Sequence, residues 1–285
     1  MENKENTSTS KTVIGIVLAI LILVVAQLLA LGVAELLVAV GLPIMIGNII
    51  TGVLYPIFTL AGLYLLCEKI LGISLGKCKI TKFSLKPVWC MAAVVMPVAV
   101  SAFFLLMKGQ LIKSNMNASQ MGAVIAGAVL FVGLSTGIVE EAVFRGVIMS
   151  LLENRFNRKV AIIAPSVLFG FVHIFGRKLD FLSILQLLVA GSIVGILFSL
   201  VTYESGTIWN SALMHGIWNM VIIGGVLQIG DTVSENAIYS YVLESKSFLI
   251  TGGDFGIESS VVAILLYLVF TILAGFLIMK KRTLD

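Results

Sequence analysis

Long runs of apolar residues, separated by short polar segments, organise most of the chain. An α-helix needs about 20 mostly apolar residues to cross the hydrocarbon core of a bilayer, and most of these runs are close to that length. The pattern therefore predicts eight transmembrane helices, over residues 12–34, 43–66, 88–107, 121–139 continuing as a helix to about 153, 160–175, 181–201, 207–228 and 259–279.

These elements predict an all-α, polytopic membrane protein with one integral-membrane domain at 12–285, preceded by a polar N-terminus at 1–11. The longest polar segment, 229–258, is too short to form a domain of its own. The apolar run after the N-terminus is longer than the usual 7–15-residue core of a signal peptide, so we expect an uncleaved first span.

Composition supports the membrane interpretation, because 59% of the residues are hydrophobic and only 12% are charged. A soluble domain has about 45–50% apolar and about 25% charged residues. The net charge of +4 is small and its basic residues lie at loop ends, which argues against a nucleic-acid partner. Cys67, Cys78 and Cys90 form no C-x-x-C pair, so neither a disulfide framework nor a cysteine-based zinc site is expected.

The distribution of Lys and Arg predicts the orientation. Most of these residues lie on the side that would hold both termini and the 67–87 loop, and few lie on the other side. Because positive residues concentrate in cytoplasmic loops, we expect both termini in the cytoplasm and the 229–258 segment outside.

Three charged residues interrupt the fourth apolar run: Glu140, Glu141 and Arg145. A charge at the middle of a membrane costs about 2.5–3.5 kcal/mol on insertion scales, so each should be paired or face a polar cavity. Residues four apart share a helix face, which predicts an ion pair between Glu141 and Arg145. Glu140 points about 100° away and has no obvious partner in its own helix.

Both histidines of the chain lie in predicted spans, His173 in the fifth and His215 in the seventh. Asn219 follows His215 by four residues, and Phe169 precedes His173 by four, so each pair should share a helix face. Three further amides in apolar runs are expected to form interhelical hydrogen bonds: Gln27, Asn48 and Gln186.

A carboxylate, two imidazoles and an amide from three spans provide the groups for hydrolysis. Glu140 can act as a general base on water, and His215 with Asn219 can donate hydrogen bonds to an oxyanion. Glu140, His173 and His215 are also candidate zinc ligands. We favour a metal-free site, because Asn219 is a poor zinc ligand and a good oxyanion donor.

Three segments carry a resemblance to a known family: "EEAVFR" (140–145), "FGFVH" (169–173) and "HGIWN" (215–219). In this order they resemble the E-E-x-x-x-R, F-x-x-x-H and H-x-x-x-N/D motifs of the CAAX-protease and bacteriocin-processing family of intramembrane endopeptidases, also called the Abi family. The resemblance covers about residues 120–225.

The resemblance implies helices around a water-filled cavity that admits a peptide substrate from the membrane. It assigns water activation to Glu140 with help from His173, oxyanion stabilisation to His215 and Asn219, and orientation of these groups to Glu141 and Arg145. It also implies bacteriocin immunity or peptide maturation as the biological setting, and family members are often described as metalloproteases. The short polar N-terminus and the Ile/Lys-rich character of the chain predict a bacterial plasma membrane.

Two other functions remain open from the sequence. A non-catalytic membrane regulator could bind a sensor kinase or transporter and use the same residues as a packing network. A transporter could relay protons through intramembrane Glu and His, although the chain shows no internal repeat that would support this.

Overall fold

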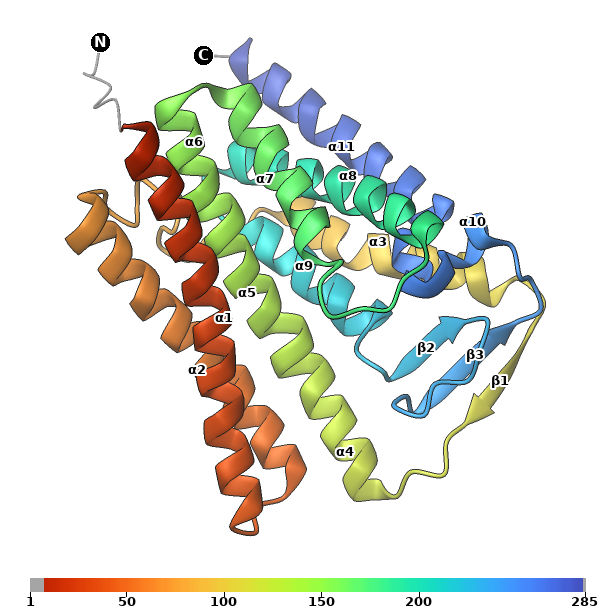
Figure 1. The fold of residues 1–285 in the computed structure, drawn as a ribbon. Coiled ribbons are helices and arrows are strands. Elements are labelled where there is room, and N and C mark those ends of the chain that lie inside the picture. Colours follow the sequence, from red (N-terminus) through yellow and green to blue (C-terminus); the bar gives the residue numbers. More distant parts are fainter. Residues whose placement is uncertain (1–7, 284–285) are drawn as a thin grey trace.

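A computed structural model of the chain describes residues 8–283 and is mainly helical (Figure 1). The principal helices are α1 (Thr9–Ala39), α2 (Ile44–Tyr64), α3 (Pro87–Leu105), α4 (Ala118–Ala126), α5 (Thr136–Glu141), α6 (Met149–Arg155), α7 (Arg158–Val172), α8 (Phe181–Ser205), α9 (Trp209–Ile222) and α11 (Val261–Arg282). Of the predicted polar N-terminus at 1–11, the structure describes residues 8–11. The side chain of Ser8 caps α1 by accepting a hydrogen bond from the Lys11 N–H.

The helix that carries the three charged residues is continuous from Ala118 to Arg155. Within it, π-helical segments at Gly127–Ser135 and Ala142–Ile148 connect α4 to α5 and α5 to α6. A third π segment, Leu65–Leu71, extends α2. π-helical turns inside α-helices often mark functional sites, and here two of them flank the Glu140–Glu141 pair.

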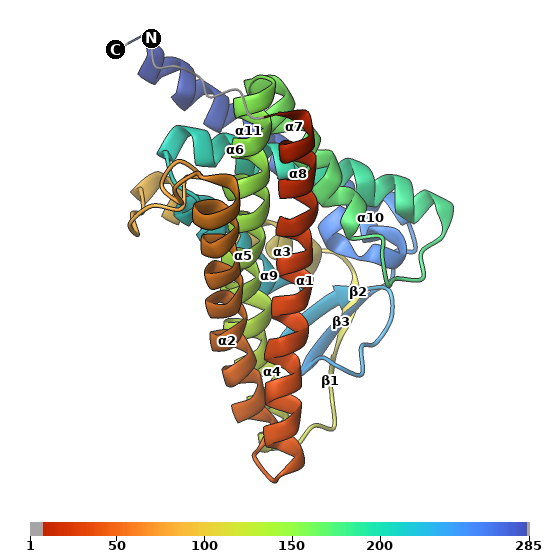
Figure 2. The same ribbon diagram turned by 60° about the vertical axis from the view of Figure 1, so that its left-hand side comes forward.

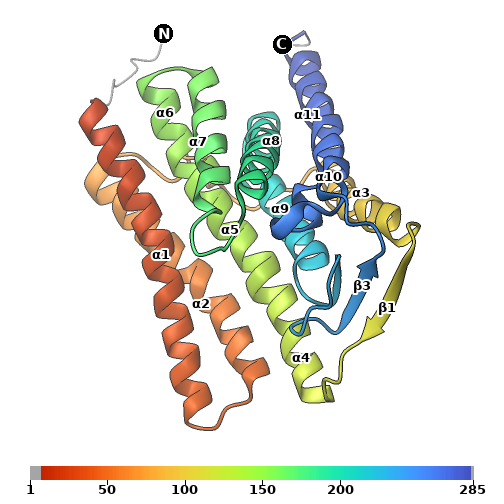
Figure 3. The ribbon, with the colours of Figure 1, turned by 45° about the vertical axis from the view of Figure 1, so that its right-hand side comes forward.

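The prediction of eight long spans is corrected in two places. Within residues 8–283, six helices are long and apolar enough to cross a membrane, whereas α7 has 15 residues and α9 has 14. The predicted span 207–228 was too long, because Gly225 adopts a left-handed φ of +81° shortly after α9 and turns the chain into a β-strand. In Figure 3, α7 ends well short of the far end of α4.

Two groups of helices make up the fold. The helices α1, α2 and the long α4–α6 helix run side by side (Figure 2). The second group contains α3, α7, α8, α9 and α11, and α9 packs against α5 to join the groups. The start of α1 and the end of α11 lie at the same end of the molecule (Figure 1), as expected if both termini are on one side of the membrane.

A three-stranded sheet, which the sequence analysis did not predict, lies beside α9. Its strands are β1 (Gly109–Lys113), β2 (Leu227–Gly230) and β3 (Tyr239–Leu243), in the order β1-β3-β2. The β1–β3 pair is antiparallel and the β2–β3 pair is parallel. The polar segment 229–258 therefore contributes to the sheet, to the short helix α10 (Phe248–Thr251) and to two 3₁₀ turns (Gly253–Phe255 and Ile257–Ser259).

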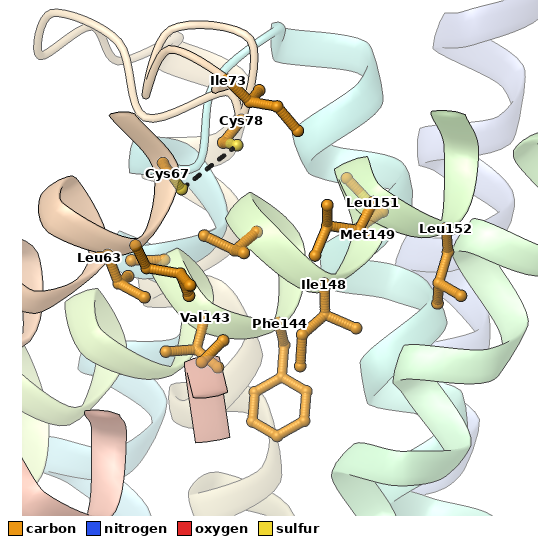
Figure 4. Close-up of a cluster of buried hydrophobic side chains, with 14 of the residues drawn as sticks. Leu63, Cys67, Ile73, Cys78, Val143, Phe144, Ile148, Met149, Leu151 and Leu152 are labelled. Atoms are coloured by element: carbon orange, nitrogen blue, oxygen red, sulfur yellow. Dashed lines mark hydrogen bonds between the residues drawn. The ribbon is translucent and has the colours of Figure 1, made fainter. Parts of the chain in front are cut away.

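One buried apolar cluster lies around the 142–152 segment, near the end of the molecule where α1 begins and α11 ends. Figure 4 draws this cluster. It includes Cys67 and Cys78, whose Sγ atoms are 3.9 Å apart and form a weak thiol hydrogen bond. All three cysteines are free in the structure.

Glycines allow the long helix that carries Glu140 and Glu141 to approach α9 closely. A Cβ atom on Gly137 would lie 2.7 Å from the carbonyl oxygen of Ala212 and 2.8 Å from the nitrogen of Gly216. Gly133 likewise lies against the Gly216 carbonyl. A side chain at these positions would separate the two helices, so the glycines determine how near Glu140 and Glu141 come to His215.

We expect Gly137→Ala to lower the melting temperature, because the added methyl group must displace backbone atoms. Overpacking of this kind costs about 1–3 kcal/mol. The matched control is Gly32→Ala in α1, where no atom lies within 4 Å of the added Cβ. That variant should be neutral or stabilising, since Ala is a better helix former than Gly. Equal melting temperatures for both variants in detergent would contradict the close-packing argument.

Candidate active site

The buried carboxylate of Glu141 holds two partners through one oxygen. Its Oε1 atom accepts a hydrogen bond from Arg145 Nη1 at 2.8 Å and lies 3.1 Å from His215 Nδ1. The predicted ion pair between Glu141 and Arg145 is therefore confirmed, and both side chains are completely buried. The contact with His215 joins this pair to α9.

The guanidinium of Arg145 is enclosed by two further helices. Its Nη2 atom donates to the carbonyl oxygen of Gly195 in α8 at 3.2 Å. Its carbon Cζ lies 4.5 Å from the ring centre of Phe169 in α7 and 5.4 Å from that of Phe198 in α8. Aromatic faces attract such a cation, so Arg145 connects its own helix to α7 and α8.

His173 is the residue that caps the C-terminus of α7. Its Nδ1 atom lies 2.7 Å from the carbonyl oxygen of Phe169, which can only accept, so Nδ1 carries the hydrogen. The Phe169 ring lies beside the imidazole, with the ring centres 4.6 Å apart, which confirms the predicted contact. The remaining ring nitrogen, Nε2, is left without a hydrogen in the neutral ring.

The same reasoning applies to His215, whose Nδ1 faces the acceptor Glu141. Both imidazoles therefore present Nε2 toward Glu140: Oε2 of Glu140 is 3.8 Å from His215 Nε2 and 4.0 Å from His173 Nε2. This oxygen is buried and has no hydrogen-bond partner within residues 8–283. Three acceptor atoms thus face one another across a gap that a water molecule can bridge.

Asn219 lies one turn after His215 in α9. Its Nδ2 atom donates to the carbonyl oxygen of Val132 at 3.1 Å. A primary amide has two N–H groups, so one remains for another acceptor.

Glu140, His173, His215 and Asn219 line one cavity of about 310 Å³, a volume within the range of ligand pockets. The structure thus brings these four predicted residues together, while Glu141 and Arg145 lie behind them. Sequence reasoning missed several other lining residues: Gln27, Arg177, Trp218, Phe255, Glu258 and Tyr267. They come from α1, the α7–α8 connection, α9 and the C-terminal region, and most carry no distinctive local signal.

Two of these residues bring further charge to the cavity. Loss of hydration raises the pKa of the Glu258 carboxyl to about 7, although the positive charge of Arg177 opposes this shift. The guanidinium of Arg177 lies 4.5 Å from the ring centre of Phe255. The cavity therefore contains a second carboxyl besides Glu140, and the charge of this second group, Glu258, changes near neutral pH.

The candidate zinc ligands do not fit the metal in this arrangement. A carboxylate and two imidazoles are suitable donors, but bonds of about 2.0–2.1 Å in tetrahedral geometry place ligand atoms about 3.3 Å apart. The two carboxylate–imidazole distances, 3.8 and 4.0 Å, are longer. Among the described residues, no group of three His, Cys, Asp or Glu side chains is placed to hold a metal ion.

Part of the chain matches the model of a known protein family. Residues 122–221 match the family model described as type II CAAX prenyl endopeptidase Rce1-like. The resemblance to CAAX-type endopeptidases is confirmed. The matched segment contains all three motifs, and together with the apolar helices it supports a membrane-embedded protease. Searches among curated proteins and solved structures gave no significant match.

We expect Arg145→Ala to lower both the yield and the melting temperature, because the variant leaves the Glu141 carboxylate buried without its cation. Breaking a buried pair in this way costs about 3–5 kcal/mol. Adding Glu141→Gln to that variant should recover part of the loss, since the stranded charge is removed. The control is Arg155→Ala, which removes an exposed hydrogen bond to Thr9 and a contact with the Phe156 ring but strands no buried charge. A melting temperature for Arg145→Ala equal to that of the control would contradict the structural role.

Proposed function

We propose that the protein is an intramembrane endopeptidase in which Glu140 activates a water molecule for attack on a peptide bond. The observation that carries this proposal is the placement of the unpartnered Glu140 Oε2 beside two imidazole nitrogens in one polar cavity. A buried carboxylate oxygen without a partner is costly, so a purely structural role does not account for its position.

The water fits between these groups. An oxygen atom that is about 2.7–3.1 Å from Glu140 Oε2 can be equally close to an imidazole Nε2, given the observed separations. Glu140 takes one proton as the water oxygen attacks the carbonyl carbon. His173 accepts the other hydrogen of the water in a hydrogen bond and fixes its direction.

Attack produces a tetrahedral intermediate with a negatively charged oxygen. The free N–H of Asn219 can donate to this oxyanion, since only one of its hydrogens is used by Val132. His215 can add a second hydrogen bond only when Nε2 also carries a proton, because its Nδ1–H is directed at Glu141. Glu140 then returns its proton to the leaving nitrogen as the C–N bond breaks, which gives a carboxyl and an amine product.

The substrate that we propose is a membrane-associated peptide or protein segment that enters from the bilayer. Bacteriocin processing or maturation of a signalling peptide, in a bacterial plasma membrane, fits the resemblance in the three motifs. Both termini would face the cytoplasm, as the distribution of Lys and Arg predicts.

We expect Glu140→Gln to abolish cleavage of a peptide library by purified protein in liposomes. The change keeps the shape of the side chain and removes its basicity, and general-base catalysis contributes about 10²–10⁴-fold to the rate. The variant should fold as well as the wild type, since Glu140 makes no hydrogen bond through Oε2 within residues 8–283. Failure of both proteins to cleave any peptide would favour the non-catalytic regulator instead.

We also expect cleavage to proceed without zinc. Protein purified without chelator should contain far less than one zinc per chain by elemental analysis, and a chelator should leave activity unchanged. The reason is the spacing of the candidate ligands, which suits a bridging water better than a metal. One zinc per chain, with activity lost on chelation and restored by zinc, would overturn the metal-free mechanism.

A further inference from the structure

The three amide side chains that were expected to bond between helices differ in their hydrogen-bond partners. The Nδ2 atom of Asn48 in α2 donates to the carbonyl oxygen of Ala123 in α4 at 2.8 Å. The Nε2 atom of Gln186 in α8 donates to the carbonyl oxygen of Leu249 in α10 at 3.4 Å. Gln27 in α1 makes no hydrogen bond to any residue in 8–283, so the expectation of an interhelical bond is wrong for Gln27.

Gln27 lies in a strongly apolar environment. Two nearby aliphatic residues of α1 are exposed on the outside of the helix assembly, Val25 at 51% and Leu28 at 64%, whereas the adjacent Ala26 is buried. Between Lys11 and Glu35 the helix carries no charged residue. An amide in such a helix normally finds a polar partner, because an unsatisfied polar group in hydrocarbon is costly.

The side chain of Gln27 instead lines the cavity that contains Glu140, His173 and Asn219. It is half-buried. It is the one residue that α1 contributes to this cavity, and α1 lies outside the matched segment 122–221. A polar group with no hydrogen-bond partner among the described residues thus faces the place where a substrate would lie.

We propose that Gln27 binds the main chain of the peptide substrate beside the scissile bond. A primary amide offers an acceptor oxygen and two N–H donors, which match the N–H and C=O of a peptide group. Gln27 would hold the substrate against the groups on α5 and α9 without taking part in proton transfer. This inference rests on the proposed endopeptidase function and adds a substrate-binding residue to its site.

The first test is Gln27→Met, which keeps the length of the side chain and removes its hydrogen-bonding groups. We expect kcat/KM to fall about 3–10-fold, the effect of losing one hydrogen bond to the substrate. The melting temperature should stay unchanged or rise, since Gln27 loses no hydrogen bond to any residue in 8–283. The matched control, Asn48→Leu, should lower the melting temperature, because it removes the hydrogen bond between α2 and the Ala123 carbonyl of α4 and leaves that carbonyl only the Gly127 N–H.

The second test uses substrates in which one backbone amide near the scissile bond is replaced by an ester. At one position the ester should reduce cleavage by the wild type about 3–10-fold. The ester lacks the backbone N–H that donates a hydrogen bond to the side-chain oxygen of Gln27. The same ester should cause no loss with Gln27→Met. Equal losses in both proteins at every position would overturn the inference.

The outcomes separate the two proposals. If the wild type cleaves, Glu140→Gln does not and Gln27→Met retains full kcat/KM, the role of Gln27 is overturned and the endopeptidase proposal stands. A lower melting temperature of Gln27→Met with unchanged kcat/KM would assign Gln27 to packing. If the wild type cleaves no peptide, the endopeptidase proposal fails, and the inference about Gln27 fails with it.

Discussion

The site depends on one carboxylate oxygen, Oε1 of Glu141, which binds Arg145 and contacts His215 at the same time. In a buried, apolar environment neither charge of the ion pair is tolerated without the other. The pair is further anchored by the Gly195 carbonyl of α8, so α5, α8 and α9 meet at one polar point. The orientation of the His215 ring follows from this contact, since Nδ1 is directed at Glu141 and Nε2 is left for the cavity.

Two adjacent carboxylates thereby acquire different environments. Glu141 is completely buried and paired, whereas Glu140 has 16% of its side chain exposed and lies along the cavity. The turn of the helix separates them by about 100°, so one carboxylate can hold the structure while its neighbour faces a substrate. Carboxylates placed in contrasting environments are a common way for an enzyme to divide structural and acid–base roles. The glycine contacts between α5 and α9 make this division possible by bringing Glu140 within 3.8 Å of His215 Nε2.

The sequence by itself determined the features that arise within one helix. Within residues 8–283, apolar run length predicted the six helices that are long and apolar enough to cross a membrane, because the bilayer requires a minimum length of apolar chain, but it overestimated α7 and α9. Four-residue spacing predicted the Glu141–Arg145 pair and the Phe169–His173 contact, since both depend on helix geometry alone. The motif resemblance, which the family match confirms, selected the residues that converge on the cavity.

Only the tertiary structure decided which residues from different elements meet. The contact between Glu141 and His215 joins positions 74 apart, and no local pattern encodes it. The sheet was missed because its strands have only four or five residues and β1 pairs with β3 across more than a hundred positions. Gln27 looked like Asn48 and Gln186 in sequence, yet it faces a cavity instead of a neighbouring helix. From sequence, an amide in an apolar run indicates only that the side chain needs a hydrogen-bond partner. The packing of the helices determines whether the amide meets another part of the protein or faces a cavity that can hold a substrate.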